Sequence, residues 1–255
     1  MTTVGVIGTG TIAAPMVRSL LRRFNDIQIV VSPRSVDTAA SLGALSSRVE
    51  IAVDNQEVLD ASDTVLLCML AEVAREILPD LTFKLSHRIV TVMIDYSVEE
   101  LLTDCWPATH IELTMPLPFI ETGGCPLPCY PTAKIVNELF GDDNPVTVLS
   151  ENITMQSYIA VAGVVSGFIQ SIDTVAGWLA EQTGHSQEAE SHVLNMLLGY
   201  LQATPRDGQN RLKQVMSDLS TEGGLNAQFR QSMLESGQVE AIRNELDILL
   251  KRLNS

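Results

Sequence analysis

The sequence predicts an α/β protein, with a doubly wound parallel sheet in its N-terminal part and only helices in its C-terminal part. Two observations support this fold class. Short apolar strands alternate with helical segments up to about residue 150, and beyond it the apolar positions recur only at helical spacing. We therefore expect one domain at residues 1–152 and an all-α domain at residues 153–255.

The alternation begins with one βαβ unit. Residues 4–7 form a short apolar strand, apolar residues between 16 and 21 recur at helical spacing, and residues 27–31 form a second strand. Later strands are predicted at residues 51–53, 64–70, 89–94 and 111–114. After residue 150 we predict no strand.

Residues 158–183 form the most apolar helical segment. Polar side chains are almost absent between residues 159 and 169, so we expect a helix that is buried on all sides. Its apolar stretch of about twelve residues is shorter than the ~20 that cross a bilayer. Gly163 and Gly167 would let a second backbone approach closely. We interpret this helix as a subunit interface; the alternative is the central helix of a monomeric bundle.

Charge and cysteine content exclude several classes of partner. The net charge of −15 disfavours nucleic acids and anionic membranes. One phosphate-bearing ligand is still compatible with this charge, because local donors outweigh a screened distant field. Cys125 and Cys129 form a lone C-x3-C without a nearby histidine, so we expect no metal site. The N-terminus lacks the basic start of a secretory signal, and we expect a cytoplasmic protein with reduced thiols.

A glycine-rich turn follows the first strand and precedes a helix. Its residues are Gly8, Thr9, Gly10, Thr11, Ile12 and Ala13, a G-x-G-x-x-A pattern. In a Rossmann domain the first glycine permits the tight turn, the second lets a pyrophosphate reach the backbone, and the small third residue packs against the strand. The phosphates then meet free N–H groups at a helix N-terminus. The N-terminal domain is therefore expected to be a Rossmann domain that binds a dinucleotide.

The end of the second strand indicates which dinucleotide binds. NAD-preferring sites place an acid there, whereas this chain has Ser32, Pro33, Arg34 and Ser35 and no acid before Asp37. The Arg34 guanidinium and the two serine hydroxyls suit a ribose 2′-phosphate, so we expect NADP(H), with NAD(H) less favoured. Further candidate cofactor contacts, at the end of the strand predicted at 64–70, are Cys68, Met69 and Leu70.

Several segments resemble the pyrroline-5-carboxylate reductase family, in the same order and spacing along nearly the whole chain. They are residues 4–13, 32–35, 115–116, 160–168 and 221–226. Met115-Pro116 stands where that family has an M-P-N-T-P loop, and Thr221–Asn226 where it has S-P-G-G-T-T. The resemblance implies a helical domain that pairs between subunits, giving a homodimer or a larger assembly of such dimers. It also implies hydride transfer to a cyclic imine near the Gly-Gly loop.

The resemblance also implies candidate substrate and catalytic residues. The substrate contacts are Met115, Pro116, Glu222, Gly223, Gly224 and Leu225, and the catalytic candidates are Asn226 and Thr221. A protonated imine is already electrophilic, so Asn226 and Thr221 need only orient it or relay a proton through water. The chain departs from the family where Leu117, Pro118 and Phe119 stand in place of the polar Asn-Thr pair. In the Gly-Gly loop, Leu225 and Asn226 replace the two threonines and Glu222 replaces proline.

Other titratable residues are expected to be peripheral. His87 is interpreted as a surface or boundary residue, and Asp142 and Asp143 as solvated charges. Two alternative functions are left open. One is a hydroxyacid-dehydrogenase-like oxidoreductase, which needs a positioned lysine where this chain has only Lys213 and Lys251. The other is a catalytically inactive, NADP-binding sensor or scaffold.

Overall fold

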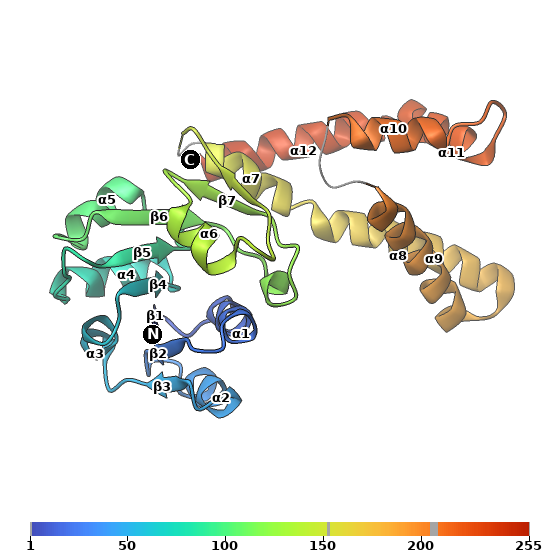
Figure 1. The fold of residues 1–255 in the computed structure, drawn as a ribbon. Coiled ribbons are helices and arrows are strands. Elements are labelled where there is room, and N and C mark those ends of the chain that lie inside the picture. Colours follow the sequence, from blue (N-terminus) through green and yellow to red (C-terminus); the bar gives the residue numbers. More distant parts are fainter. Residues whose placement is uncertain (1, 152–153, 205–208, 255) are drawn as a thin grey trace. The chain divides into compact units, whose positions relative to one another are not determined.

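The computed structural model describes residues 2–151, 154–204 and 209–254. The chain divides into two compact units, residues 1–158 and 159–255, whose elements are labelled in Figure 1. The domain boundary that the sequence predicts, between residues 152 and 153, lies outside the described residues. Each unit is described by itself below.

The first unit is an eight-stranded sheet flanked by helices. Its elements, with η for 3-10 helices, are β1 (Thr3–Ile7), α1 (Ala13–Arg23), β2 (Gln28–Val31), α2 (Val36–Leu45), β3 (Val49–Ile51), α3 (Asn55–Asp60), β4 (Thr64–Leu67), α4 (Ala71–Ile77), η1 (Leu78–Asp80), β5 (Arg88–Thr91), α5 (Val98–Asp104), β6 (His110–Thr114), η2 (Pro118–Glu121), β7 (Leu127–Tyr130), α6 (Lys134–Phe140) and β8 (Val146–Val148). The strand order is β3-β2-β1-β4-β5-β6-β7-β8. The first six strands are parallel in the Rossmann order, which confirms the predicted fold class.

The strand register brings the ends of four strands to one edge of the sheet. Ile7 of β1 pairs with Leu67 of β4, Leu67 with Thr91 of β5, and Thr91 with Leu113 of β6. The segments that leave these strands therefore lie along the same edge. We call it the carboxyl edge, and it consists of residues 8–12, 68–72, 92–97 and 115–121. The chain winds one way from β1 and the other way from β4, so the ligand crevice of a Rossmann fold falls between these two strands.

Two strands, β7 and β8, were not predicted from the sequence. β7 contains Pro128 and lies between Pro126 and Pro131, and prolines normally argue against a strand. It pairs antiparallel with β6 through only Leu113–Tyr130 and Thr114–Cys129. β8 has three residues and two of them are exposed, so it carries no clear periodic signal. Tertiary pairing forms these strands despite weak local propensity.

A buried carboxylate fixes the start of α6 against β6. Glu112 of β6 is buried, and its carboxylate oxygens accept the amides of Lys134, Ile135 and Val136 at 2.6, 2.9 and 2.9 Å. It also accepts the Thr132 hydroxyl at 2.6 Å. The carboxylate oxygens thus supply acceptors to amides at a helix N-terminus that has no side-chain cap of its own. Glu112 thus joins a helix to the sheet by four hydrogen bonds.

The sequence interpretation of Asp142 and Asp143 as solvated charges is wrong, because both carboxylates form ion pairs. Arg22 of α1 donates to Asp143 at 2.7 Å, and Arg23 lies 2.9 Å from Asp142. The two acids follow α6 in a turn, so their side chains reach back to the last turn of α1. Exposed pairs of this kind each contribute little to stability, about 0–1 kcal/mol, but they define which face of α1 points toward this turn.

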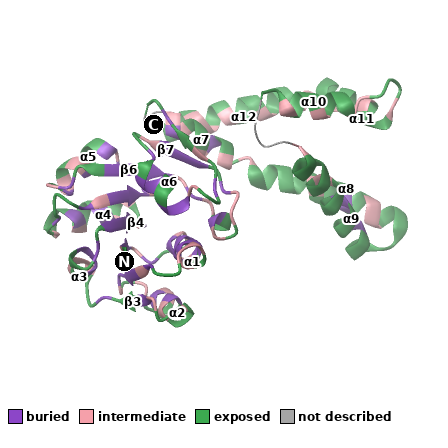
Figure 2. Cartoon of the chain, in the orientation of Figure 1, coloured by how far each residue is buried: buried purple, intermediate pink, exposed green. Residues whose placement is uncertain are grey.

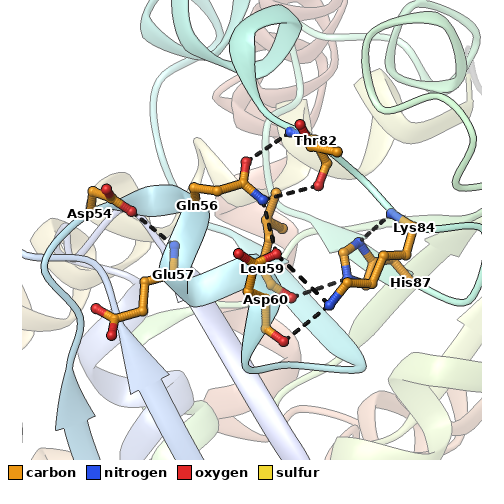
Figure 3. A network of polar contacts seen from close by, with 8 residues as sticks. All are labelled: Asp54, Gln56, Glu57, Leu59, Asp60, Thr82, Lys84 and His87. Atoms are coloured by element: carbon orange, nitrogen blue, oxygen red, sulfur yellow. Dashed lines mark hydrogen bonds and ion pairs between the residues drawn. The ribbon is translucent and has the colours of Figure 1, made fainter.

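His87 was expected to be a surface or boundary residue, and this expectation is wrong, because the structure buries it completely. Figure 3 shows its hydrogen bonds to Lys84 and Leu59. Its Nδ1 accepts the Lys84 amide at 3.1 Å, so Nε2 carries the proton and donates to the Leu59 carbonyl, also at 3.1 Å. Beside it, Gln56 of α3 exchanges two hydrogen bonds with the Thr82 backbone. Burial lowers the pKa of His87 below its ordinary value of 6.5, and the charge of Lys84 acts in the same direction. The residue ties α3 to the segment before β5.

The second unit contains only helices among its described residues, as predicted. They are the end of α7 (Thr154–Ala162), α8 (Val165–Thr183), α9 (Ser186–Ala203), α10 (Arg211–Asp218), α11 (Leu225–Glu235) and α12 (Gln238–Leu253). α8 and α9 pack as a hairpin that turns at Gly184, whose positive φ of 75° closes α8. Ala176, Ala189 and Val193 are buried in this hairpin.

The apolar helix of this unit is not continuous, and within one chain it is not buried on all sides. A turn at Gly163-Val164 separates α7 from α8, and most of α8 is exposed, as Figure 2 shows. By length and composition, residues Thr154–Thr183 could cross a membrane, and only 11% of their most apolar window is buried. The exposed large side chains of α7 and α8 are Tyr158, Val161, Val165, Phe168, Ile169, Val175 and Trp178. The described residues of one chain leave this surface uncovered, so the expected subunit interface stays a prediction.

The two glycines singled out in this segment differ in what they contact. A Cβ at Gly163 would lie 3.1 Å from Leu249 Cδ1 of α12, so Gly163 allows close packing within the chain. A Cβ at Gly167 would have no atom within 4 Å. The close approach expected from both glycines is therefore intramolecular at Gly163, whereas Gly167 has open space in place of a side chain.

Candidate functional site

The turn after β1 requires a glycine at its first position. Gly8 has a φ of +93°. A Cβ on it would lie 2.6 Å from the carbonyl oxygen of Cys68, the residue that follows β4. Its amide donates to Ser32 Oγ at 2.9 Å, which ties the turn to the end of β2. β1, β2 and β4 therefore hold the turn at the carboxyl edge, in the crevice where Rossmann ligands bind.

The first turn of α1 presents unpaired amides. Ala13, its first residue, donates back to the Gly10 carbonyl at 3.2 Å, while the amides of Gly10, Thr11 and Ile12 have no acceptor among the described residues. The Thr9 hydroxyl is buried and, within the described chain, also has no partner. A buried donor left without a partner costs about 1–3 kcal/mol. An anion against this turn would supply the acceptors, so the residues present fit a dinucleotide pyrophosphate.

Gly10 leaves room for that anion. It is exposed, and the nearest atom to a Cβ built on it is the Cys68 carbonyl oxygen, 3.7 Å away. No strain in the chain itself therefore requires a glycine at this position. Ile12 is half-buried and Ala13 fully buried against the strand, so these two of the predicted cofactor residues pack α1 onto the sheet.

The three residues predicted to bind a 2′-phosphate are placed differently from one another. Arg34 is exposed in the segment between β2 and α2, and within the described chain it forms no ion pair. Ser35 is the half-buried N-cap of α2 and makes no capping bond. Ser32, in contrast, is completely buried and accepts the Gly8 amide, so the structure assigns it to the shape of the turn.

The end of β4 forms the opposite wall of the crevice. Cys68 is buried with its Sγ 3.9 Å from Met16 Sδ, and burial raises the pKa of its thiol to about 12. The thiol therefore stays protonated and contributes packing rather than nucleophilic chemistry. Met69 is half-buried and Leu70 is 73% exposed, so side chains as well as backbone from this segment are accessible.

The loop after β6 is held in place by three contacts. The Leu117 amide donates to Cys125 Sγ at 3.3 Å. Ile120 of η2 is fully buried in the main core, and Glu121 of the same helix forms an ion pair with Arg18 of α1. The predicted substrate residues Met115 and Pro116 precede this anchored segment and lie at the carboxyl edge, half-buried and buried respectively. Phe119, between the anchors, is 46% exposed.

The remaining predicted residues lie in the second unit, in the turn before α11. They are Thr221, Glu222, Gly223, Gly224, Leu225 and Asn226, and all except Gly224 are exposed. Gly223 has a φ of +71°, as a tight turn requires. The Gly224 amide donates to the Thr221 carbonyl at 2.9 Å, so this predicted substrate contact has no free amide to offer. Leu225 is 84% exposed at the first position of α11.

Sequence reasoning missed one segment of the carboxyl edge, Val92-Met93-Ile94. The sequence predicts that these residues continue a strand over residues 89–94, but β5 ends at Thr91. There the Thr91 hydroxyl accepts the Met93 amide at 3.1 Å, which turns the chain away from the sheet. The signal for this turn was a single threonine within an apolar run, too weak to identify it.

Taken together, the strand order, the glycine turn and the free amides of α1 define a Rossmann domain of the dinucleotide-binding class. Comparison with known proteins agrees. Residues 3–96 match the family model described as "NADP oxidoreductase coenzyme F420-dependent". No curated protein matches the chain by sequence comparison.

Solved structures match over the whole chain. A pyrroline-5-carboxylate reductase from Coxiella burnetii superposes with a TM-score of 0.83 at 18% identity, covering 99% of this chain and 97% of that one. The Plasmodium falciparum pyrroline carboxylate reductase, solved with NADP bound, gives 0.80 at 13% identity and the same coverage. A reductive aminase from Aspergillus terreus in complex with NADPH and ethyl-5-oxohexanoate gives 0.57 at 14% identity, covering 97% and 99%.

The chain therefore has the pyrroline-5-carboxylate reductase fold in both of its units, which confirms at the level of the fold the resemblance found in the sequence. The family match covers only the part that contains the glycine turn and the ends of β2, β4 and β5. It bears on the dinucleotide-binding half, and it leaves the second substrate open.

Proposed function

We propose that this protein is an NADP(H)-dependent oxidoreductase that reduces the C=N bond of a small cyclic imine. The observation that carries the proposal is the turn from Gly8 to Ile12, with its free amides and the unpartnered Thr9 hydroxyl, within a fold that matches pyrroline-5-carboxylate reductases end to end. The relatives solved with NADP or NADPH support the choice of cofactor.

In this proposal two groups of residues hold the cofactor. The amides of Gly10, Thr11 and Ile12 bind the pyrophosphate at the N-terminus of α1, where the helix dipole favours negative charge. The Arg34 guanidinium binds the 2′-phosphate as a charge-assisted pair, with Ser35 as an additional hydroxyl donor. The absence of an acid between Val31 and Asp37 supports NADP(H) over NAD(H).

The reaction then needs little from the protein beyond position and shelter from water. When bound, NADPH supplies a hydride to the carbon of a protonated C=N bond, which becomes a C–N amine as NADP⁺ is left behind. The segments that follow β4, β5 and β6 line that space with apolar side chains. Cys68 stays protonated and cannot accept a proton, and the Tyr96 hydroxyl is occupied by Asp104. Proton exchange is therefore left to water, with Asn226 and Thr221 as the predicted orienting groups.

A coupled assay tests this function. Purified full-length protein is mixed with NADPH and a panel of cyclic imines, and loss of NADPH absorbance is followed. Turnover of an imine is expected. Turnover of hydroxyacids with NADP⁺ instead would indicate the dehydrogenase alternative, and tight NADPH binding without any turnover would indicate a sensor or scaffold.

We also propose that the protein is a cytoplasmic homodimer in which a second copy covers the exposed apolar face of α8. The four cysteines are free thiols, which suits a reducing compartment. A bilayer is a poorer cover than a second copy, because Asp173 lies within α8 and an acid at a membrane centre costs about 2.5–3.5 kcal/mol. Phe168 of α8 and Leu45 of the first unit are each 50% exposed, so a substitution at Leu45 serves as the control for the same substitution at Phe168.

Light scattering on an aspartate variant at each of these two positions tests the dimer. Phe168→Asp should yield monomers or a marked rise in the dissociation constant, whereas Leu45→Asp should leave the dimer intact. Equal masses for wild type and Phe168→Asp, with unchanged far-UV circular dichroism, would contradict the interface. Co-sedimentation of wild type with lipid vesicles would indicate a membrane as the cover instead.

A further inference from the structure

We infer that the substrate of the proposed reaction is a hydrophobic cyclic imine that carries no carboxylate group. This inference rests on the proposed function and concerns the same site. Its basis is the chemistry of the carboxyl edge, where the segments that leave the central strands are apolar and the only charged groups are acids.

Three neighbouring segments of the edge consist of apolar residues. They are Cys68-Met69-Leu70 after β4, Val92-Met93-Ile94 after β5, and Met115-Pro116-Leu117 after β6, followed by Pro118 and Phe119. The pairing of Leu67 with Thr91, and of Thr91 with Leu113, places these three segments next to one another. In a Rossmann fold, this edge is where the ligand lies. Any molecule bound here meets thioether, aliphatic and aromatic surface.

This apolar surface is accessible and firmly held. Leu70 and Phe119 are exposed, and Met69, Ile94 and Leu117 are half-buried. The Leu117 amide is bound by Cys125 Sγ, and η2, which carries Phe119, is fixed by buried Ile120. A rigid apolar wall binds a hydrophobic ligand with little loss of conformational entropy.

The charges along the edge are negative. Its residues include no lysine, arginine or histidine, while Glu72, Asp95 and Glu121 are acids. Arg75 is the first basic residue after β4. It donates to the Asp95 carbonyl at 2.6 Å and to the Glu100 carboxylate at 3.3 Å. Its guanidinium also lies 4.6 Å from the centre of the Tyr96 ring.

The remaining cation near this edge, Arg18 of α1, is paired with Glu121. A substrate carboxylate would therefore find no unpaired cation here, and the net charge of −15 would repel it further. A protonated imine has the opposite sign and is favoured by Glu72 and Asp95. Of the ligands that the proposed reaction allows, the edge thus selects a cationic ring with apolar substituents.

The test uses three substrates with the same ring: 2-methyl-1-pyrroline, 2-phenyl-1-pyrroline and 1-pyrroline-2-carboxylate. With full-length protein and NADPH, we expect kcat/KM for the methyl compound to exceed that for the carboxylate by about tenfold or more, and the phenyl compound to be reduced at least as well. A preference for the carboxylate would overturn the inference while leaving imine reduction in place.

A charge variant tests whether this edge is responsible. Leu70→Lys places a cation at the carboxyl edge. Leu85→Lys is the matched control, because Leu85 is 65% exposed in the segment that precedes β5 and so lies at the opposite end of that strand. Leu70→Lys should lower the methyl-to-carboxylate ratio by about fivefold, the effect of one close charge pair in water, and Leu85→Lys should not change it. An unchanged ratio in both variants would contradict the assignment.

If no imine is reduced, product binding tests the inferred preference for an uncharged substituent separately from the proposed imine reduction. Calorimetric titration of 2-methylpyrrolidine and of proline into protein saturated with NADP⁺ measures the same discrimination without turnover. Tighter binding of 2-methylpyrrolidine, weakened by Leu70→Lys, would support the inference even though the proposed reaction had failed. Tighter binding of proline, or binding of neither compound, would overturn it.

Discussion

Replacing Gly10 by alanine separates cofactor binding from folding. In the chain itself the new methyl group has space, since its nearest neighbour would be the Cys68 carbonyl oxygen at 3.7 Å, an ordinary van der Waals contact. The unfolded state also loses conformational freedom when glycine becomes alanine. We therefore expect the free energy of unfolding to stay the same or to rise by about 0.4–1 kcal/mol.

The cofactor, in contrast, should bind more weakly. A methyl group on Gly10 keeps a pyrophosphate from reaching the amides at the start of α1. Charge-assisted hydrogen bonds contribute about 1.5–3 kcal/mol each, so the loss of one of them predicts about 2–3 kcal/mol. This corresponds to a rise in the dissociation constant of NADPH of roughly 30- to 150-fold.

Gly8→Ala provides the contrast. Its methyl group would lie 2.6 Å from the Cys68 carbonyl oxygen, on a residue with a φ of +93°, so both stability and binding should fall. Calorimetric titration with NADPH and urea unfolding followed by circular dichroism measure the two effects. The reasoning is refuted if Gly10→Ala binds NADPH as tightly as wild type, or if it unfolds as readily as Gly8→Ala.

Three further predictions concern other residues. Arg34→Ala should weaken NADPH binding by about 1–3 kcal/mol and leave NADH nearly unchanged; equal losses for both cofactors would contradict the 2′-phosphate assignment. Burial lowers the pKa of His87 in the folded state below 6.5, so the folded chain binds fewer protons than the unfolded chain at lower pH, and the free energy of unfolding should decrease as the pH falls through 6.5 toward the folded-state pKa. His87→Gln should remove up to about 1.4 kcal/mol per pH unit of that slope, and identical slopes in urea titrations would count against it. Glu112→Gln replaces an acceptor of four hydrogen bonds by an amide with one oxygen, and should lower the thermal midpoint through a loss of about 1–3 kcal/mol; an unchanged midpoint would show that the cap is dispensable.

The parts of the fold that could be predicted are those fixed by local pattern. The turn at Gly8 and Gly10 follows from residue types that tolerate a positive φ and close approach, and the six parallel strands are short apolar runs. β7 could not be predicted, because Pro128 contradicts its local propensity and only pairing with β6 forms it. The burial of His87 is likewise a tertiary effect, set by the Leu59 carbonyl from another element.

Site residues that follow a single strand could be predicted from the sequence. Site features that depend on several strand ends lying side by side were harder to predict. Arg34 and the amides near Gly10 follow from one βαβ unit, whereas the role of Ser32 depends on a hydrogen bond to Gly8 across two strands. The apolar edge depends on the register of β4, β5 and β6, which a single sequence does not state. The apolar composition of α8 is evident from the sequence, but its exposure within one chain could not be predicted from it.

Calorimetric titration of the folded wild-type protein with NADPH and with NADH tests the account most directly. We predict one saturable site per chain, with NADPH bound at least about tenfold more tightly than NADH, the effect of one charge-assisted contact at the 2′-phosphate. Neither cofactor producing heat or raising the thermal midpoint would contradict the assignment of the α1 turn as a dinucleotide site.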